Sequence, residues 1–508
     1  MHIIWQPENK LLYNNRNTLI FNEDIMKINR IGMFHANFCG ISSRTCGAGT
    51  YSINQLNALD KLNKSNLQQQ IIPFWVGLDY AANITEGDGL LIVNNQILNH
   101  TQTICKKWDG ETILVTKRDG SKFDIFWDES QWLERSRLTA KVIVKKIIDL
   151  HTAFTAIKVV ANDIMYATLP KLILNELEDC SNLTHSEISL IKDKLSLMWV
   201  PHSTSKNYQA AGLNSVENNN NVSILREKLE QESINDAKVY NYTVGAIGEH
   251  FAQHLVKDYG LDRKHLKILK SGIFLEPYLN SFDNTVINEE LTKLSIPLEC
   301  NYIFDIGQGI CHKGHDITIK AFAELVHKNR VKYKDLHLVL LAPERITQDP
   351  LHTQRINMLI EKLNITDKVI YISRWNANLA KYMYGCPRTL ITLLPVRESP
   401  EDLIPMECRT NPINSILITS NIGSNRHQVL DGKDGFLVTL KNEISSDTIE
   451  QINTQDNLYL HNKDWVTTLE KVLDLAEDKR FMIIEAGKQK ISICYDVVKN
   501  FEYNFIKI

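Results

Sequence analysis

Short apolar runs alternate with amphipathic segments of helical length along most of the chain, and this alternation restricts the fold more than any other feature. In the second half, the apolar runs are NYIFDIG at 301–307, LHLVLLAP at 336–343, KVIYISR at 368–374 and TLITLLP at 389–395. Buried strands separated by helices form right-handed βαβ units and parallel sheets with helices on both faces. The sequence therefore predicts an α/β fold.

The first half shows the same alternation, so we expect two domains. Its apolar runs are KINRIGMFHANF at 27–38, IIPFWVGLDY at 71–80, IKVVAND at 157–163 and LSLMWVPHSTS at 195–205. Two such halves predict two Rossmann-like domains that face one cleft, an N-terminal domain at residues 1–282 and a C-terminal domain at 283–475. Residues 476–508 show no further strand alternation, and we expect helices there that cross back to the first domain.

One segment of the first half breaks the alternation. Residues 89–127 combine β-rich runs with the turn pairs Asn-Asn, Asp-Gly and Asp-Gly. An Asp-Gly pair between apolar runs is a strong hairpin signal. We therefore expect a β-hairpin insertion at about 89–127 in the N-terminal domain.

Composition excludes several classes of function. At 508 residues, with 43% hydrophobic and 23% charged residues, the chain can form two or three full cores. Its formal net charge of -3 gives no general attraction to nucleic acid or anionic lipid, so an anionic ligand must be held by local groups. The 9 cysteines form no CxxC pair, which argues against zinc. No apolar run reaches the roughly 20 residues that span a bilayer, and we expect a cytoplasmic protein.

A glycine-rich turn follows the expected strand at 301–306, and ligands of open α/β sheets bind at the carboxyl ends of strands. The turn, GQGICHKGHD at 307–316, contains Gly307, Gln308 and Lys313 and leads into an amphipathic helix. Glycines let the backbone approach an anion, a helix N-terminus presents free N–H groups, and a lysine adds a positive charge. The pattern indicates a diphosphate site. A purely structural turn is the alternative, because the spacing matches neither a Walker loop nor GxGxxG.

A cluster of carboxylates follows the expected strand at 389–395. The segment RESPEDLIPMEC contains Glu398, Glu401, Asp402 and Glu407. Carboxylates at a strand end can bind sugar or ribose hydroxyls, or stabilise positive charge at an anomeric carbon. The alternative is an ordinary acidic first helical turn, which is favourable with the helix dipole.

A third segment, SNIGSNRHQVLDGKDGFLV at 420–438, adds another glycine turn. In this order and at this separation, the three segments resemble the C-terminal half of the GT-B glycosyltransferases, specifically the retaining glycogen and starch synthase-like and GT4-like groups. In the first half, CGAGTYSINQLNAL resembles the first glycine loop of that family. MWVPHSTSKNYQ resembles the family strand that ends in a histidine near the reacting sugar. The resemblance therefore extends over both halves of the chain.

The resemblance implies a hexosyltransferase that uses a nucleotide sugar, such as a UDP-, ADP- or GDP-hexose, with retention of anomeric configuration and without a metal or other cofactor. Lys313 would neutralise the leaving diphosphate, Glu398 would face the transferred sugar, and His202 would contact that sugar. Glu407 would hydrogen-bond the ribose. The other residues that the resemblance implies for donor binding are Gly47, Gly49, Gly307, Gln308, Arg374, Leu403 and Ile404. The acceptor, whether glycan, protein or small molecule, is not implied.

The sequence departs from the family pattern in four places. Gln308 stands where the family has an arginine that binds the diphosphate, and Glu398 and Glu407 are one residue farther apart than usual. The other two departures fall in the third segment, where Ser424 and Asn425 replace part of a glycine pair, and Arg426 and His427 stand where an acidic residue is common. The candidates to replace the missing arginine are Arg374, Arg397 and Arg426.

These departures leave three alternatives to an active transferase. The first is a catalytically weak or silent nucleotide-sugar-binding protein, which the loss of the arginine favours. The second is a sugar-nucleotide epimerase, which shares the two-domain fold. The third is a nicotinamide dehydrogenase that uses Gly307 and Gly309 in its dinucleotide loop, although the next strand is followed by an acidic residue only at Glu344.

Overall fold

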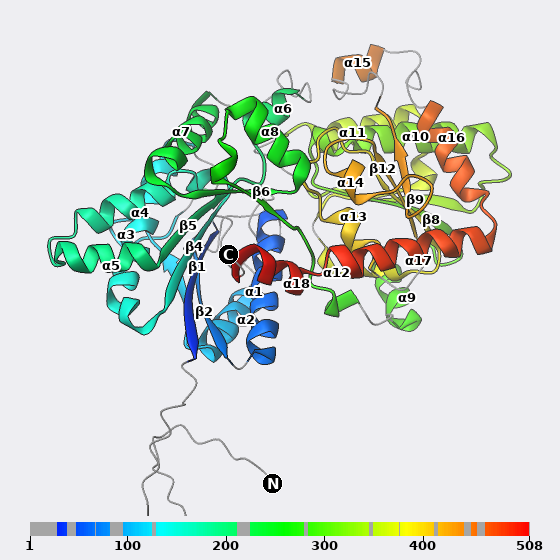
Figure 1. Ribbon diagram of the computed structural model, residues 1–508. Coiled ribbons are helices and arrows are strands. Elements are labelled where there is room, and N and C mark those ends of the chain that lie inside the picture. The colour runs from blue at the N-terminus through cyan, green and yellow to red at the C-terminus, as the bar shows by residue number, and fades with distance from the viewer. Residues whose placement is uncertain are drawn as a thin grey trace, which may run out of the picture.

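The computed structural model describes residues 28–37, 47–66, 68–81, 95–123, 129–210, 224–278, 283–344, 349–374, 376–410, 415–440, 449–454 and 463–506. They form two sheets flanked by helices, and the two units lie side by side (Figure 1). Every pairing between named strands is parallel in the part of the chain that the structure describes. The predicted α/β fold with two Rossmann-like domains is confirmed.

The first domain is built on a 7-stranded sheet with the order β3-β2-β1-β4-β5-β6-β7. Its strands are β1 (Asn29–Asn37), β2 (Gln69–Leu78), β3 (Glu111–Val115), β4 (Ala156–Asn162), β5 (Leu195–Val200), β6 (Thr243–Ile247) and β7 (Leu266–Leu269). β1 is apolar along most of its length because the helices on the two faces bury it, as is usual for parallel sheets. The direction of sheet growth reverses between β1 and β4, which makes their carboxyl ends a topological switch point.

Helices cover both faces of this first sheet. They are α1 (Gly47–Ser65), α2 (Asn95–Lys107), α3 (Trp132–Leu150), α4 (Leu169–Glu178), α5 (His185–Lys194), α6 (Ser205–Ala210), α7 (Ile224–Tyr240) and α8 (Glu249–Tyr259). In Figure 1, α3, α4, α5 and α7 lie on one side of the sheet, and α1 and α2 lie on the other. The first core therefore has two layers of helices around one layer of strands.

The expected β-hairpin insertion at about 89–127 is wrong within the described part of that segment. Residues 95–107 form α2, and β3 pairs in parallel with β2, so the segment is an ordinary βαβ unit. The buried residues of α2 recur at helical spacing, namely Ile97, Thr101, Ile104 and Cys105. This period of 3.6 residues outweighs the Asp-Gly pairs, which form turns at Asp109 and Gly120 with positive φ but do not join antiparallel strands. Residues 89–94 and 124–127 lie outside the described residues.

The second domain repeats the design with a 6-stranded sheet in the order β10-β9-β8-β11-β12-β13. Its strands are β8 (Asn301–Ile306), β9 (Leu336–Leu341), β10 (Val369–Ile372), β11 (Thr389–Leu394), β12 (Ile416–Ser420) and β13 (Phe436–Val438). Its helices are α9 (Asn284–Lys293), α10 (His315–Lys328), α11 (His352–Lys362), α12 (Ala377–Gly385), α13 (Ile404–Glu407), α14 (Asn425–Gln428), α15 (Ile449–Thr454) and α16 (Lys463–Leu473). The switch point here lies between β8 and β11.

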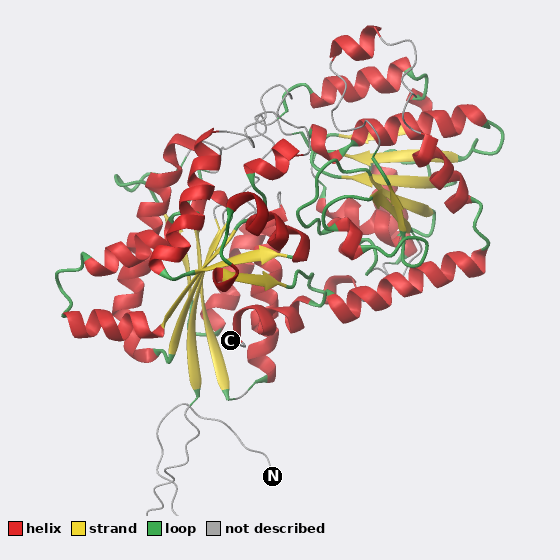
Figure 2. Ribbon diagram, turned by 45° about the horizontal axis from the view of Figure 1, so that its top comes forward, coloured by secondary structure: helices red, strands yellow, loops and turns green. Residues whose placement is uncertain are grey.

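Two helices near the C-terminus connect the domains. The long helix α17 (Glu477–Cys494) lies along the second domain, and the short helix α18 (Val497–Phe501) reaches the first, where it lies beside α1 (Figures 1 and 2). Val497 and Phe501 are buried in the core of the first domain. Beside this crossing, the Ile273 N–H donates to the Tyr495 carbonyl at 3.0 Å, and the Val497 N–H donates to the Ile273 carbonyl at 3.1 Å. The domain boundaries proposed at 282/283 and 475/476 stay predictions.

Candidate functional site

The turn after β8 is held in one conformation by its neighbours. The Gly307 N–H donates to the Leu341 carbonyl at 3.1 Å, and the Gly309 N–H donates to the Pro343 carbonyl at 2.7 Å. Gly314 precedes α10 with a φ of +73°, and a Cβ there would lie 1.9 Å from the Pro395 carbonyl oxygen. Because only glycine fits at this position, the start of α10 and the end of β11 lie in direct contact.

Lys313 joins this turn to the acidic segment after β11. Its Nζ donates to Asp402 Oδ1 at 2.8 Å, and both side chains are largely buried. The other carboxylate oxygen of Asp402 is buried and has no hydrogen-bond partner among the described residues. The turn and the acidic segment therefore share one polar site.

Gln308 lies between β8 and Lys313, half-buried. Its backbone carbonyl lies 3.0 Å from His315 Nε2, and His315 Nδ1 lies 3.0 Å from Asp305 Oδ2. The buried carboxylate of Asp305 and the Gln308 carbonyl raise the pKa of His315, in opposition to burial. This histidine, which sequence reasoning did not select, fixes the backbone that the predicted phosphate turn depends on.

Glu398 lies at the boundary of the two domains. Asn207 Nδ2, on α6 of the first domain, donates to Glu398 Oε1 at 3.2 Å. Burial raises the pKa of Glu398 to about 7, and the nearby Asp402 carboxylate adds to this effect, while the Asn207 hydrogen bond opposes it. The predicted sugar-facing carboxyl thus sits on the cleft side of the second domain and contacts the first.

Asn207 is positioned by a buried ion pair on α7. Arg226 Nε donates to Glu230 Oε1 at 2.8 Å, and both side chains are almost fully buried. Glu230 accepts a hydrogen bond from the Ser205 N–H, at the start of α6, and Arg226 Nη2 donates to the Ser203 carbonyl at 2.9 Å. These contacts hold the segment between β5 and α6.

His202 lies in the same segment, after β5. Its Nε2 lies 3.3 Å from Asn162 Oδ1 at the end of β4, and its ring meets that of Tyr51 edge-on with 4.9 Å between centroids. Burial lowers the pKa of His202, so the imidazole is neutral at pH 7. Tyr51 belongs to the first turns of α1, which begins at Gly47 and includes the buried Gly49. The predicted residues of the first half therefore converge at one sheet edge.

The remaining predicted residues are more scattered. Leu403 and Ile404 are half-buried at the start of α13, and Glu407 is half-buried at its end. Arg374 is exposed in a bend after β10. Arg397, a candidate to replace the missing arginine, is instead buried and pairs with Asp316 through both terminal nitrogens at 2.7 Å.

Glu401 connects the two domains, a role that sequence reasoning did not assign to it. It accepts hydrogen bonds from Ser271 Oγ of the first domain and from Gln428 Nε2 of α14, the latter at 2.9 Å. Burial raises the pKa of Glu401 to about 7. No local pattern reveals this contact, because Ser271 lies 130 positions away in the sequence.

A pocket of about 350 Å³ lies between α8 of the first domain and α14 of the second. Glu398 lines one side of it, together with Ser399 and Gly423, and α8 lines the other. In Figure 1, α8 and α14 face each other across the boundary of the two domains. The pocket is therefore formed only when both domains are present.

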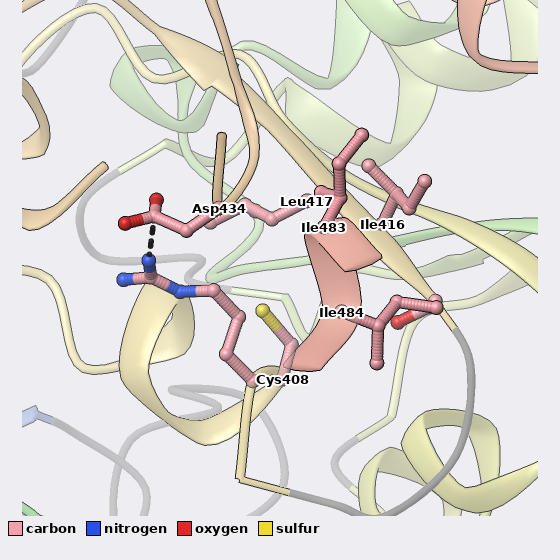
Figure 3. Close-up of a pocket in the computed structure, with 8 residues that line it drawn as sticks. Cys408, Ile416, Leu417, Asp434, Ile483 and Ile484 are labelled. Carbon is pink, nitrogen blue, oxygen red and sulfur yellow. Dashed lines mark hydrogen bonds and ion pairs between the residues drawn. The ribbon is translucent and has the colours of Figure 1, made fainter. Parts of the chain in front are cut away.

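A much smaller cavity lies inside the second domain, under α17 (Figure 3). It holds about 10 Å³ and is lined in part by Cys408, Ile483 and the ion pair of Arg409 Nη1 with Asp434 Oδ1 at 3.1 Å. A volume of this size corresponds to about one water molecule. We therefore assign this cavity to the packing of α17 and not to ligand binding.

Two general properties bear on the expectations from sequence. Among the described residues, no group of three or more His, Cys, Asp or Glu side chains is arranged to hold a metal ion. Within the same part of the chain, every helix is too short or too polar to cross a lipid bilayer.

Solved structures with the same architecture are known, although no model of a protein family and no curated protein sequence matches this chain. A glycosyltransferase from Rickettsia africae gives a TM-score of 0.57 at 14% identity over 94% of this chain and 100% of that chain. Sucrose-phosphate synthase from Thermosynechococcus elongatus gives 0.61 at 12% identity, over 94% and 97% of the two chains. HepE from Anabaena, in complex with UDP and glucose, gives 0.56 at 12% identity, over 93% and 97%.

These matches span both domains and nearly the whole of each chain, while the sequences share few residues. They agree with the two parallel sheets and their flanking helices. The chain therefore has the GT-B fold, and the resemblance that its sequence shows to the retaining GT-B glycosyltransferases is confirmed at the level of the fold.

Proposed function

We propose that this protein is a glycosyltransferase that uses a nucleotide-sugar donor and retains the anomeric configuration. One observation carries the proposal. Lys313, at the turn after β8, meets the carboxylate segment after β11 at the switch point of the second sheet, where ligands of such sheets bind. A cation, a helix N-terminus and buried carboxyls at one place suit a sugar linked to a diphosphate.

In this proposal, Lys313 exchanges its partner when the donor binds. Without donor, the ammonium is neutralised by Asp402. A diphosphate offers more negative charge and more acceptor oxygens, so Lys313 and the first N–H groups of α10 would turn to it and stabilise it as a leaving group. We propose that these groups supply the positive charge that other transferases take from a divalent metal.

The transfer itself needs no protein nucleophile. The bond from the anomeric carbon to the diphosphate oxygen breaks, and a bond from the acceptor hydroxyl oxygen forms on the same face. The acceptor proton passes to the departing phosphate oxygen. We assign Glu398 to a hydroxyl of the transferred sugar and the neutral His202 to the same sugar from the first domain.

The donor to test first is UDP-glucose, because HepE, which shares this fold, has been solved in complex with UDP-glucose. We assign Glu407 to the ribose of the nucleotide, and Leu403 and Ile404 to the donor through their backbone at the start of α13. ADP- and GDP-hexoses are the next donors in the series. We also propose that the protein acts in the cytoplasm.

The test compares Lys313→Ala with Lys328→Ala, whose lysine is exposed at the far end of α10. Loss of one charged donor to the leaving group lowers turnover by about 100-fold or more. We expect that loss in UDP release from UDP-glucose by Lys313→Ala, with the circular dichroism spectrum of the wild-type fold, and wild-type rates for Lys328→Ala. Equal rates in the two variants would refute the assignment of Lys313.

A silent nucleotide-sugar-binding protein is the second candidate. Gln308 in place of an arginine, with Lys313 already neutralised by Asp402, favours it. Under this alternative, calorimetry would show UDP-glucose binding that Lys313→Ala weakens, while neither hydrolysis nor transfer occurs with any donor.

A further inference from the structure

The pocket between α8 and α14 is lined on its first-domain side by one face of a helix. His250, Gln253, His254 and Lys257 recur at positions i, i+3, i+4 and i+7 of α8, and all four line the pocket. Each of these side chains carries an N–H donor. None of the four is acidic, and Asp258 is the one carboxylate that α8 adds to the lining of the pocket.

The second domain adds a cation from the opposite side. Arg426, on α14, lines the same pocket, and its Nε donates to the Asn421 carbonyl at 3.0 Å. No carboxylate lies within ion-pair distance of Arg426, His250 or Lys257 among the described residues. Burial lowers the pKa of His250, and His427 and Arg426 lower it further by repulsion. Lys257 from the first domain and Arg426 from the second thus bring two cationic side chains to the pocket.

Two acidic groups also line the pocket, and each accepts a hydrogen bond from within the protein. Asp258 Oδ2 accepts from His254 Nδ1 at 2.6 Å, and the other ring nitrogen of that histidine lies 2.7 Å from Thr204 Oγ1. Glu398 accepts from Asn207, and its pKa of about 7 leaves it partly protonated at neutral pH. His250, Gln253, Lys257 and Arg426 remain for a ligand, and all four are suited to an anion.

We propose that this pocket binds an anionic group of the acceptor substrate, best matched by a phosphate monoester on a sugar. The inference rests on the proposed transferase function, because Glu398, which faces the transferred sugar in that proposal, forms one wall of the pocket. The anion stays unchanged in the reaction. It holds the acceptor so that a hydroxyl oxygen bonds to the anomeric carbon as the diphosphate leaves with the acceptor proton.

The first experiment measures binding of inorganic phosphate to the full-length protein by calorimetry, with UDP present to fill the donor site. We expect Arg426→Gln and Lys257→Gln each to weaken phosphate binding at least 5-fold, while Lys257→Gln keeps the wild-type affinity for UDP. Arg330→Gln, with its arginine exposed just beyond the far end of α10, is the matched control and stays at the wild-type value. Phosphate binding that is absent, or equal in all variants, overturns the proposal.

The second experiment compares acceptors, with UDP-glucose as donor. We expect a kcat/KM for hexose 6-phosphates at least 10-fold above that for the free hexoses, and Arg426→Gln to remove the difference through KM. Equal use of both acceptor sets by the wild type overturns the proposal. Selective weakening of UDP-glucuronate binding in Arg426→Gln would place the anion on the donor sugar and overturn the acceptor assignment.

The binding results distinguish an error in the acceptor site from an error in the proposed function. If UDP and UDP-glucose do not bind at all, the proposed function fails, and phosphate binding is then measured in Lys313→Ala to remove the other anion site. If UDP-glucose binds and is hydrolysed while Arg426→Gln and Lys257→Gln bind phosphate as the wild type does, only the acceptor site is wrong.

Discussion

Glu398 and Glu401 are two carboxyl groups that the fold buries where the domains meet, and burial raises the pKa of each to about 7. Between pH 4.5 and 7, the folded protein therefore keeps protons that the unfolded chain has released. The free energy of unfolding falls as pH rises through this window and levels off above it. At neutral pH, ionisation of these two buried carboxyl groups therefore lowers the free energy of unfolding, and other interactions in the fold offset the loss.

We predict that Glu398→Gln removes about half of this dependence. The variant gains stability relative to the wild type as pH rises from 5 to 8, by up to about 3 kcal/mol, because a pKa unit is worth about 1.4 kcal/mol. Urea unfolding at the two pH values measures the difference. Glu477→Gln, at an exposed position, is the control and shifts neither value. A stability gain for Glu398→Gln that is the same at pH 5 and pH 8 would contradict the burial argument.

At the scale of single residues, the sequence predicts which side chains lie at the site but not their partners. Lys313 and Glu398 follow strands, so their placement at one sheet edge follows from the topology. The Asp402 partner of Lys313 lies 89 positions away, and the Asn207 partner of Glu398 lies 191 positions away. The first contact depends on how the second domain folds and the second on how the two domains are oriented, and no local pattern encodes either.

At the scale of elements, the start of α10 depends on one glycine. We predict that Gly314→Ala destabilises the protein by at least about 3 kcal/mol, because the new Cβ would overlap the Pro395 carbonyl and force a shift of the backbone. Gly432→Ala is the matched control, with a φ of +70° and no atom within 4 Å of the added Cβ, and it costs about 1 kcal/mol from backbone strain alone. Thermal unfolding of both variants measures the two losses of stability. Equal losses of stability in the two variants would show that the contact with Pro395 is unimportant.

The ion pair of Arg397 with Asp316 connects the segment after β11 to the first turn of α10. We predict that Arg397→Met costs about 3–5 kcal/mol, because it leaves the Asp316 carboxylate buried without its partner. The double variant Asp316→Leu/Arg397→Met recovers much of this loss, since no buried charge remains. Urea denaturation measures both. A double variant no more stable than the single one would show that the pair contributes more than the burial cost of one charge.

The error at 89–127 shows where element prediction fails. Asp-Gly pairs predict tight turns, and turns form at Asp109 and Gly120. Those turns connect α2 to β3 and follow β3, because the residues before the first turn repeat their apolar positions at helical spacing. Turn residues predict where the chain reverses, but they do not predict whether helices or strands flank the turn. The spacing of apolar residues predicts the flanking elements and has to be assessed before the turns.

At the scale of the whole molecule, the first domain depends on α18. We predict that Phe501→Ala destabilises that domain by about 3–5 kcal/mol, because the ring is fully buried in its core. Amide exchange should accelerate in β1 while β8 of the second domain stays protected. Ile493→Ala removes a side chain that is 71% exposed and serves as the control. Equal acceleration in both domains would show that they unfold as one unit.

Two parallel sheets and their cleft could be predicted from the order of apolar runs, because strand and helix alternation leaves few topologies. The pocket between α8 and α14 could not be predicted from the sequence. The i, i+3, i+4, i+7 face of α8 is visible in the sequence, but Arg426 completes it only after the domains meet. The structure therefore adds most where one domain contacts the other.

The return of α18 to the first domain has a consequence for synthesis of the protein. Residues 29–269 supply the 7 strands of the first sheet, yet Val497 and Phe501 complete its core. On the ribosome, domains near the N-terminus usually fold first. Because Val497 and Phe501 follow the second domain in the sequence, they can cover the apolar surface beside α1 only after that domain has been translated. The chain is thus a candidate for chaperone protection during that interval, and its second domain has the opportunity to fold before its first is finished.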